Sequence, residues 1–336
     1  MKKIAVVGSG SWGTALAVML DKYGHDVTMW SWKEEEAKRI REEKEHKEFL
    51  PGVPIRDSLK VVTSPKEAVT DAEIVITAIP SKFLRLNMEK FKPYIKENQI
   101  IVNVSKGLED GTLFRLSQVL EQCFPKNEIL VLSGPSHAEE VGREIPTACV
   151  IAGKNQDTLK MIQEEFMNPK FRLYTNSDII GVELGAALKN VIALAAGMSD
   201  GLGFGDNTKA ALMTRGMTEI CRLGVAMGGE MQTFMGLSGI GDLIVTCTSM
   251  HSRNRRAGIL LGQGKTLKEA VEEVHMVVEG ANTAKAAYDL AEKFHVDMPI
   301  IREINQVLFA DKDARQAVLD LMLREGKAES IKYTMD

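Results

Sequence analysis

The feature that most constrains the fold stands near the start of the chain, where Gly8, Gly10 and Gly13 follow a short apolar run. Residues 2–7, KKIAVV, are typical of a buried strand, and residues 14–20, TALAVML, of an apolar helix. A GxGxxG pattern alone is weak, but between a strand and a helix it predicts the turn that receives the pyrophosphate of a dinucleotide. The alternative is a glycine-rich turn with only a structural role.

Seven further strand-like segments follow in the first half of the chain. They are residues 26–31, 59–63, 73–79, 99–104, 128–133, 147–153 and 171–175. Helical patterns lie between many of them, and the highly charged residues 33–50 predict a helix with a solvated face. Such alternation predicts an α/β fold with a parallel, doubly wound sheet, on which ligands bind at the carboxyl ends of the strands.

The pattern becomes helical after about residue 176. Residues 177–201 predict one long helix that is apolar on nearly every side. Helical periods recur over 206–227, 267–274, 281–294 and 301–309, and no convincing strand follows Thr175. The 336-residue chain is therefore expected to form two domains, a dinucleotide-binding Rossmann-type domain over 1–177 and an all-α substrate-binding domain over 178–336.

The composition of the chain limits the kinds of molecule that it is expected to bind. The net charge of −4 and the pI near 6 offer no general attraction to nucleic acid or to anionic membranes. The four cysteines form no CxxC pair and the histidines lack ligand spacing, which predicts no metal site, no disulfide framework and a reducing cytoplasm. Residues 191–198 are too short to span a bilayer, so we expect no stable membrane insertion.

Lys189 is the most informative single residue, because it stands in the middle of the long apolar helix. Burying an unpaired ammonium is costly, so this lysine must snorkel to solvent, pair with an acid or lower its pKa. The last two outcomes suit proton transfer near neutral pH. A snorkelled lysine remains the alternative.

Two loops at strand ends are candidates for ligand binding. Lys106 follows the strand 99–104, and residues 134–140 follow the strand 128–133. Within the second loop, Ser136 is expected to be the N-cap of a helix whose first turn exposes free backbone N–H groups. Two ordinary strand-to-helix loops are the alternative.

A third cluster lies in the second half of the chain. Asp242 stands among small residues, and Arg253, Asn254, Arg255 and Arg256 form a short basic run. Guanidinium groups match the oxygens of a dianionic phosphate, so the run predicts a phosphate site. The alternative is a basic helix start on the surface.

Cofactor choice depends on the segment after the second strand. NAD-selective sites usually hold the ribose 2′-hydroxyl with an acid about 20 residues beyond the glycines. Here the strand is followed by Ser31, Trp32 and Lys33, with no acid before Glu34. This favours binding of NADP(H), with NAD(H) still possible.

Taken together, six segments resemble the bacterial NAD(P)-dependent glycerol-3-phosphate dehydrogenases. They are GSGSWGTALA (8–17), SKGLE (105–109), SGPSHAEEV (133–141), ELGAALKNVIALAAGMSDGL (183–202), GDLIVTCTSMHSRNRRAG (241–258) and VEG (278–280). The resemblance covers nearly the whole chain. It implies reversible reduction of dihydroxyacetone phosphate to sn-glycerol 3-phosphate for glycerophospholipid synthesis, a helical domain like that of 6-phosphogluconate dehydrogenase, and a homodimer.

The resemblance also implies roles for individual residues. Cofactor contacts would come from Gly8, Gly10, Ser11, Trp12, Gly13, Trp32, Lys33, Lys106, Ala138, Arg253, Val277 and Glu279. Substrate contacts would come from Lys106, Gly134, Ser136, Lys189, Asp242, Ser252, Arg253 and Asn254. Lys189 would be the general acid/base, with Lys106 and Asp242 as its catalytic partners.

Two rival functions share parts of this pattern. A hydroxyacid or ketopantoate-type dehydrogenase could have the same architecture, although the arginine run argues against it. A non-catalytic sensor of NADP(H) would need only the dinucleotide-binding domain, and Lys189 would then have no task.

Overall fold

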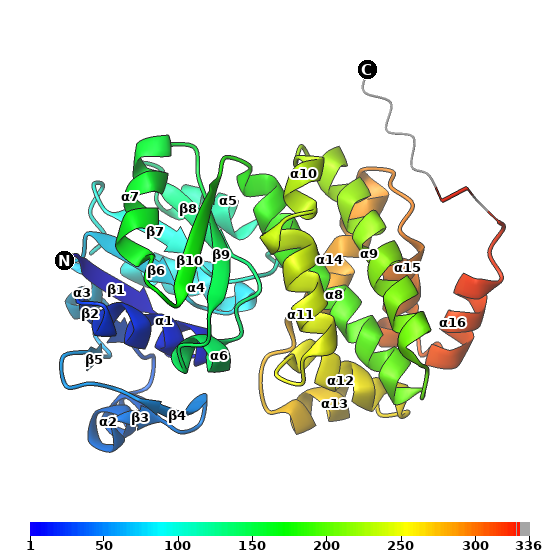
Figure 1. Cartoon of the computed structure of the whole chain (residues 1–336), viewed down its shortest axis with the longest axis horizontal. Coiled ribbons are helices and arrows are strands. Elements are labelled where there is room, and N and C mark those ends of the chain that lie inside the picture. Colours follow the sequence, from blue (N-terminus) through cyan, green and yellow to red (C-terminus); the bar gives the residue numbers. More distant parts are fainter. Residues whose placement is uncertain (327, 330–336) are drawn as a thin grey trace.

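The strands of the first half assemble into one eight-stranded sheet in the computed structural model, which describes residues 1–326, 328 and 329 (Figure 1). The strands are β1 (Lys3–Val7), β2 (Asp26–Trp30), β5 (Lys60–Val62), β6 (Ile74–Thr77), β7 (Ile100–Asn103), β8 (Ile129–Ser133), β9 (Thr147–Ala152) and β10 (Phe171–Asn176). Their order is β10-β9-β8-β7-β6-β1-β2-β5. All eight predicted strands are therefore present, each within about two residues of its expected ends.

One junction departs from the expected all-parallel sheet. β8 pairs with β9 in antiparallel register, with Leu132 opposite Ile151, whereas the other neighbouring strands are parallel. The connection between these two strands contains only the five-residue helix α6 (Ala138–Gly142). A parallel return usually needs a full crossover helix, so the short connection brings β9 back in the opposite direction.

Helices cover both faces of the sheet, as a doubly wound fold requires. They are α1 (Ser11–Lys22), α2 (Glu34–Glu43), α3 (Pro65–Val69), α4 (Leu84–Phe91), α5 (Leu116–Cys123) and α7 (Gln156–Phe166), with the 3-10 turn η1 (Ser81–Phe83) before α4. Buried side chains of α1, α2, α6 and α7 form one apolar cluster with the sheet, and those of α3, α4 and α5 form another. The predicted fold class is confirmed.

The prediction of one helix over residues 33–50 is wrong for the second half of that range. α2 ends at Glu43, and Lys44 takes a left-handed conformation with φ of 54°. The chain then forms a small antiparallel hairpin of β3 (Glu45–His46) and β4 (Leu50–Pro54). Leu50 and Val53 of this hairpin are buried and contact Gly142 on α6, a burial that a continued charged helix would not provide.

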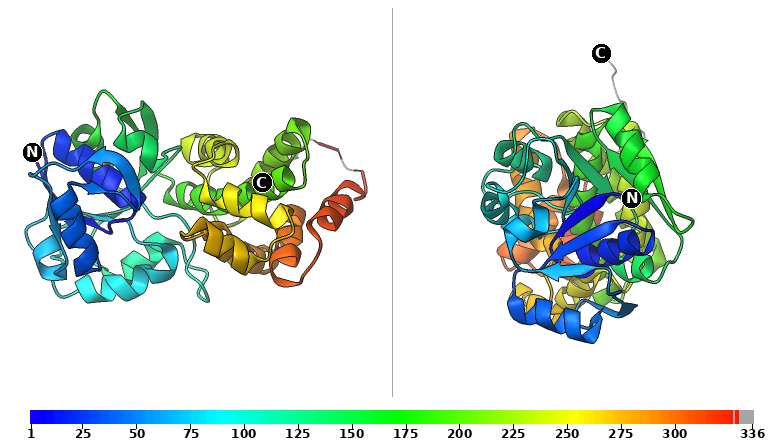
Figure 2. Two further views of the ribbon diagram at one scale, coloured as in Figure 1. Left: turned by 90° about the horizontal axis from the view of Figure 1, so that it is seen from below. Right: turned by 90° about the vertical axis from the view of Figure 1, so that its left-hand side faces the viewer.

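The second half is helical throughout its described part. Its elements are α8 (Ile179–Gly201), α9 (Asp206–Ala226), α10 (Met231–Phe234), the π-turn η2 (Leu237–Gly241), α11 (Asp242–Thr248), α12 (Arg253–Gly262), α13 (Leu267–Val274), α14 (Glu279–Lys293), α15 (Pro299–Phe309) and α16 (Ala314–Met322). Seen from below, this helical lobe and the α/β lobe occupy opposite ends of the molecule (Figure 2).

α8 is the central helix of the helical lobe. It is long and apolar enough to cross a bilayer, yet 89% of its most apolar window is buried inside the protein. Glycines permit the closest packing: a Cβ added at Gly197 would lie 2.1 Å from the carbonyl oxygen of Arg255, and one at Gly258 2.0 Å from that of Leu194. α8 and α12 therefore touch backbone to backbone, and this contact fixes where α12 begins.

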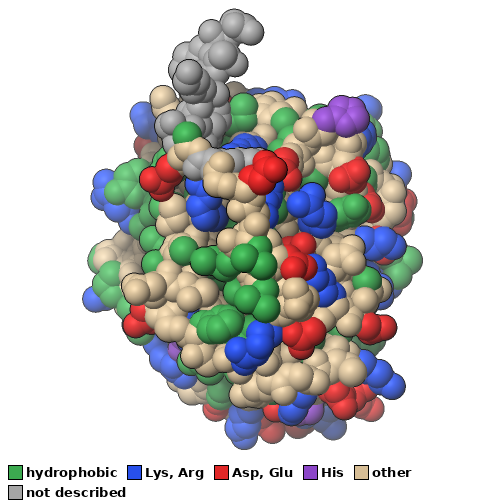
Figure 3. Space-filling model, turned by 90° about the vertical axis from the view of Figure 1, so that its right-hand side faces the viewer, with side chains coloured by type: hydrophobic (Ala, Val, Ile, Leu, Met, Phe, Trp, Pro, Cys, Tyr) green, Lys and Arg blue, Asp and Glu red, His purple; other side chains and the backbone are tan. Residues whose placement is uncertain are grey.

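The junction between the lobes is short, because β10 ends at Asn176 and α8 begins at Ile179. We propose the domain division at 177/178, with the α/β domain before it and the helical domain after it. The outer end of the helical lobe carries hydrophobic side chains among charged ones of both signs (Figure 3). Met322 and Leu323 near the end of α16 are among its exposed side chains.

Candidate active site

The turn between β1 and α1 has the shape of a pyrophosphate cradle. Gly8 has φ of +126°, and a Cβ there would lie 2.4 Å from the carbonyl oxygen of Ala78. A Cβ at Gly13 would lie 2.1 Å from the carbonyl oxygen of Gly8, whereas one at Gly10 would meet nothing within 4 Å. Gly8 and Gly13 thus permit the close turn, and the backbone at Gly10 is left unobstructed. No side chain caps α1 at Gly10, so its first N–H groups are available to an anion.

The turn after β2 lies beside this cradle, because β1 and β2 are neighbouring parallel strands. Trp32 is 67% exposed, and the Lys33 Nζ lies 4.3 Å from the centre of its ring. The Glu34 carboxylate bonds the Thr63 hydroxyl at 2.7 Å and the Arg41 guanidinium at 2.5 Å. The first acid after β2 is therefore already engaged, whereas Lys33 has no ion pair with an acid among the described residues.

Lys189 is buried and paired, so the snorkelled alternative is excluded. Its side chain comes from the middle of α8 and is 5% exposed. The Nζ donates to the Asp242 Oδ1 at 2.8 Å and to the Thr246 Oγ1 at 2.5 Å. Asp242 and Thr246 are four residues apart on α11, so both acceptors lie on the same face of that helix.

Asp242 also joins the two lobes. Its Oδ2 accepts from the Lys106 Nζ at 2.6 Å, and Lys106 donates in addition to the Gly134 carbonyl at 3.0 Å. Lys106 follows β7 and Gly134 follows β8, which are adjacent parallel strands of the sheet. The carboxyl edge of the sheet and the centre of the helical lobe thus meet at one carboxylate between two ammonium groups.

The electrostatics of this trio favour proton transfer. The pKa of Lys189 is lowered to about 8, mainly by burial. The Lys106 ammonium also lowers this pKa, whereas the Asp242 carboxylate raises it. Burial opposes ionisation of Asp242, but the Lys106 and Lys189 charges outweigh it and lower the pKa of that carboxyl. Lys189 can therefore change its protonation state near neutral pH while Asp242 remains a carboxylate.

The start of α12 is hydrogen-bonded to α8 at Asn190, the residue after Lys189. The Ser252 hydroxyl caps the helix by accepting from the Arg255 N–H at 3.2 Å. The Asn254 amide donates to the Asn190 Oδ1 on α8 at 3.0 Å and accepts from the Gly280 N–H at 2.8 Å. Arg253 is half-buried, and burial lowers the pKa of its guanidinium.

The arginine run does not act as a unit. Arg255 Nε donates to Asp200 at 2.8 Å and its Nη1 to the Thr248 carbonyl at 2.6 Å. The Arg255 guanidinium is therefore already engaged by Asp200, whereas the role of the arginine run in binding a phosphate stays a prediction.

The loop after β8 differs in one detail from expectation. His137, not Ser136, is the N-cap of α6, and the Ser136 hydroxyl donates to the Gly134 carbonyl at 3.1 Å. Ala138 is the buried first residue of α6. The His137 ring lies 5.8 Å from that of His251, and burial lowers its pKa with help from the nearby Lys189 charge.

Glu279 makes a second connection between the lobes. Its carboxylate accepts from the Ser81 N–H at 3.0 Å and from the Ser81 hydroxyl at 2.6 Å. Ser81 follows β6, and a Cβ at Gly107 would lie 3.2 Å from the Glu279 Oε2. Val277 lies two residues before this contact, in the loop that leads into α14.

Thr246 and Ser81 are the site residues that sequence reasoning missed. Thr246 stands one helical turn after Asp242, a spacing that could have indicated it.

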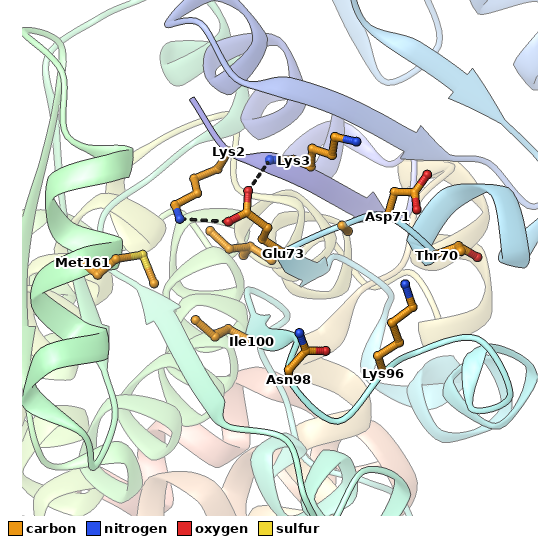
Figure 4. Close-up of a pocket in the computed structure, with 11 residues that line it drawn as sticks. Lys2, Lys3, Thr70, Asp71, Glu73, Lys96, Asn98, Ile100 and Met161 are labelled. Atoms are coloured by element: carbon orange, nitrogen blue, oxygen red, sulfur yellow. Dashed lines mark hydrogen bonds and ion pairs between the residues drawn. The ribbon is translucent and has the colours of Figure 1, made fainter.

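Among the described residues no group of three His, Cys, Asp or Glu side chains could hold a metal ion. A cavity of about 360 Å³ lies at the opposite, amino-terminal edge of the sheet, where Lys2 pairs with Glu73 (Figure 4). It is remote from the carboxyl edge at which such sheets bind ligands.

Comparisons with known proteins find relatives over nearly the whole chain. The model of the NAD-dependent glycerol-3-phosphate dehydrogenase N-terminus matches residues 3–159, and that of the C-terminus matches residues 178–319. A relative from Fusobacterium nucleatum, named glycerol-3-phosphate dehydrogenase (NAD(P)+), is 55% identical over 98% of this chain and 99% of its own. One of the same name from Bacillus subtilis is 50% identical over 98% and 96%.

Solved structures give the same result. A glycerol-3-phosphate dehydrogenase from Coxiella burnetii matches with a TM-score of 0.93 and 37% identity, covering 96% of this chain and 99% of that one. A ketopantoate reductase from Ralstonia eutropha matches with a TM-score of 0.61 and 14% identity, covering 95% and 99%. The second likeness concerns the fold alone.

Proposed function

The chain belongs to the family of NAD-dependent glycerol-3-phosphate dehydrogenases and reduces dihydroxyacetone phosphate with NAD(P)H, and we propose that Lys189 is the proton donor of that reaction. The reduced nicotinamide, when bound, supplies a hydride to the carbonyl carbon. The residues of the chain bind the cofactor and substrate, orient the carbonyl group and deliver the proton. The same groups serve oxidation of sn-glycerol 3-phosphate in reverse.

Gly8, Gly10 and Gly13 form the pyrophosphate site, and Ser11 and Trp12 at the start of α1 extend it. The open backbone beside Gly10 and the uncapped start of α1 support this assignment. We also assign to the cofactor the side chains that border this turn or the gap between the lobes. They are Trp32, Lys33, Lys106, Ala138, Arg253, Val277 and Glu279.

Lys189 donates its proton to the substrate oxygen as negative charge develops there. Its pKa of about 8 keeps it mostly an ammonium at pH 7 and makes it a competent donor. Asp242 holds the Nζ in place by the 2.8 Å contact and keeps the pKa from falling further. In the oxidation direction the neutral amine accepts the proton.

Lys106 stabilises the developing charge on the same oxygen. It is fixed by Asp242 and by the Gly134 carbonyl, so its ammonium needs no reorganisation during the reaction. Ser136 lies in the same loop as Gly134 and contacts the substrate from the α/β side. The proposal thus uses two positive groups and one acceptor around the reacting carbonyl.

The phosphate of the substrate binds at the start of α12. Ser252, Arg253 and Asn254 form its first turn, where free N–H groups and a guanidinium favour a dianion. Binding energy from this non-reacting end orients the carbonyl toward Lys189. A 2-keto acid lacks the phosphate and loses that contribution.

The observation that carries the proposal is the buried Lys106–Asp242–Lys189 trio at the carboxyl edge of the sheet. The test follows the absorbance of NADPH and of NADH with dihydroxyacetone phosphate, and in parallel with ketopantoate. The proposal predicts turnover on the phosphate substrate and at least ~100-fold lower kcat/KM on the keto acid, since the phosphate contacts proposed at the start of α12 are lost. Preferred turnover of ketopantoate would show the rival dehydrogenase, and binding of cofactor without turnover would show a sensor.

We further propose that the enzyme works in the cytoplasm as a homodimer and supplies glycerol phosphate for phospholipid synthesis. These points follow from the family resemblance. Light scattering of the purified protein tests the homodimer.

A further inference from the structure

A buried carboxylate lies directly behind the glycine turn. Glu36, in the first turn of α2, is only 5% exposed. Its Oε1 accepts a hydrogen bond from the Ser9 hydroxyl and another from the Ser31 hydroxyl, the latter at 2.7 Å. Ser9 stands between Gly8 and Gly10, so one carboxylate oxygen is bonded to the loop that forms the pyrophosphate cradle.

The second contact leads to the other cofactor-binding segment. Ser31 is fully buried at the end of β2, and its hydroxyl accepts from the Lys33 N–H at 3.4 Å. Trp32 and Lys33 lie in the turn after β2 that the proposed function assigns to the cofactor. Glu36 is thus the one side chain among the described residues that is hydrogen-bonded to both Ser9 and Ser31.

Among the described residues, no lysine or arginine forms an ion pair with this carboxylate. The basic side chain that approaches it is His46 on β3, whose Nε2 lies 3.8 Å from the Glu36 Oε1. The Nε2 is buried and has no hydrogen-bond partner among the described residues. Burial lowers the pKa of His46, opposed by the Glu36 charge, so the ring is largely neutral at pH 7. Burying a carboxyl group whose hydrogen bonds come from two serine hydroxyls is costly, and a cost of this kind indicates a task.

We propose that Glu36 is a positioning residue of the dinucleotide site: it fixes the glycine loop through Ser9 and the Trp32–Lys33 turn through Ser31. This role rests on the proposed function, because it presupposes that the two segments bind NAD(P). A carboxylate is a stronger acceptor than an amide or hydroxyl, so it holds both hydroxyls in one geometry before the cofactor arrives. Glu36 acts through these serines and stays out of contact with the reacting atoms.

Glu36→Gln is the direct test, because the amide has the same shape and lacks the charge. Glu35→Gln is the matched control. Glu35 is exposed, and its substitution removes the same type of side chain from the same helical turn. Ser9→Ala removes the other end of the bond without altering α2. Dissociation constants for NADPH and NADH are measured by calorimetry without substrate, followed by kcat and KM with dihydroxyacetone phosphate.

The proposal predicts that Glu36→Gln and Ser9→Ala each raise the dissociation constants of NADPH and NADH about tenfold, the range expected for a lost charge-assisted hydrogen bond. The ratio of NADPH to NADH affinity, kcat and the KM for dihydroxyacetone phosphate should stay within about twofold, as should every constant of Glu35→Gln. If Glu36→Gln only lowers the melting temperature and binds both cofactors like the parent, the carboxylate serves stability and the proposal is wrong.

Two other outcomes also contradict it. A tenfold change in the NADPH to NADH ratio would mean that Glu36 touches the ribose itself. Failure of the parent protein to bind either cofactor would overturn the proposed function, and this role with it.

Discussion

Asp242→Asn is the perturbation that most directly probes the charge arrangement of the site. The Asp242 carboxylate is 1% exposed and accepts from Lys106 at 2.6 Å and from Lys189 at 2.8 Å. The amide of asparagine keeps the shape but removes the only negative charge assigned to the trio. Two ammonium groups then face each other, and the Lys189 pKa must fall because its charged form has lost its counter-ion.

The size of the shift follows from the distance. Opposite charges about 4 Å apart interact by about 4 kcal/mol at an effective dielectric constant near 20, and neighbouring opposite charges move pKa values by about 1–3 units. Taking about 2 units, the Lys189 pKa falls from about 8 to roughly 6. At pH 7 the protonated fraction then drops from roughly nine-tenths to one-tenth.

The assay is kcat for reduction of dihydroxyacetone phosphate between pH 5 and 9. Reduction needs the ammonium form, so the rate is full below the Lys189 pKa and is lost as the pH rises through it. The descending limb should lie near pH 8 in the parent and about 2 units lower in Asp242→Asn. Asp200→Asn is the control, because Asp200 also pairs with two cations, Lys209 at 2.7 Å and Arg255 at 2.8 Å, but lies outside the trio. A folded Asp242→Asn protein whose limb stays near pH 8 would refute the reasoning.

Three further predictions use other parts of the structure. Lys106→Met removes the ammonium that lowers the Lys189 pKa, so the descending limb should move to higher pH, opposite to Asp242→Asn; a shift to lower pH would contradict this. Arg253→Ala should raise the KM for dihydroxyacetone phosphate at least about tenfold, whereas Arg255→Ala, whose side chain bonds Asp200, should alter thermal stability and leave that KM within about twofold. Burial raises the pKa of Glu219, which accepts from the Ile300 and Ile301 N–H groups, to about 7; the folded state therefore holds its proton more tightly, and about 3 kcal/mol of stability present below pH ~4.5 is lost by pH ~7. Urea unfolding at pH 5 and pH 8 should show that Glu219→Gln reduces this loss, and parallel curves would contradict it.

Local sequence patterns predicted the elements of the fold well. The strands of the first half and the long helices of the second are dictated by hydrophobic periodicity, which needs no knowledge of tertiary contacts. The two errors arose where tertiary contacts decide. The charge pattern of 33–50 favoured one helix, but burial of Leu50 and Val53 against Gly142 favoured a hairpin. The reversed direction of β9 follows from the brevity of one connection.

The sequence singled out three residues that the structure brings together, Lys106, Lys189 and Asp242, but not their pairings. Its place in an apolar helix left Lys189 either buried and paired or snorkelled to solvent; its partner Asp242 is 53 residues away, and Lys106 is 136 residues from that same acid. Such pairings depend on how the two lobes meet, which no local pattern contains. The same holds for the arginine run: nearby residues on a helix point in different directions, and the pairing of Arg255 with Asp200 depends on the packing of α12 on α8.

The central claim, that Lys189 is the proton donor, is tested most directly by the turnover of Lys189→Met. The methionine retains the apolar stem and removes the ammonium, and NADPH binding measured by calorimetry shows whether the protein remains folded. The account predicts a fall in kcat of at least ~100-fold, with NADPH affinity within about twofold of the parent. A folded, NADPH-binding Lys189→Met protein that turns over dihydroxyacetone phosphate at nearly the parent rate would contradict it.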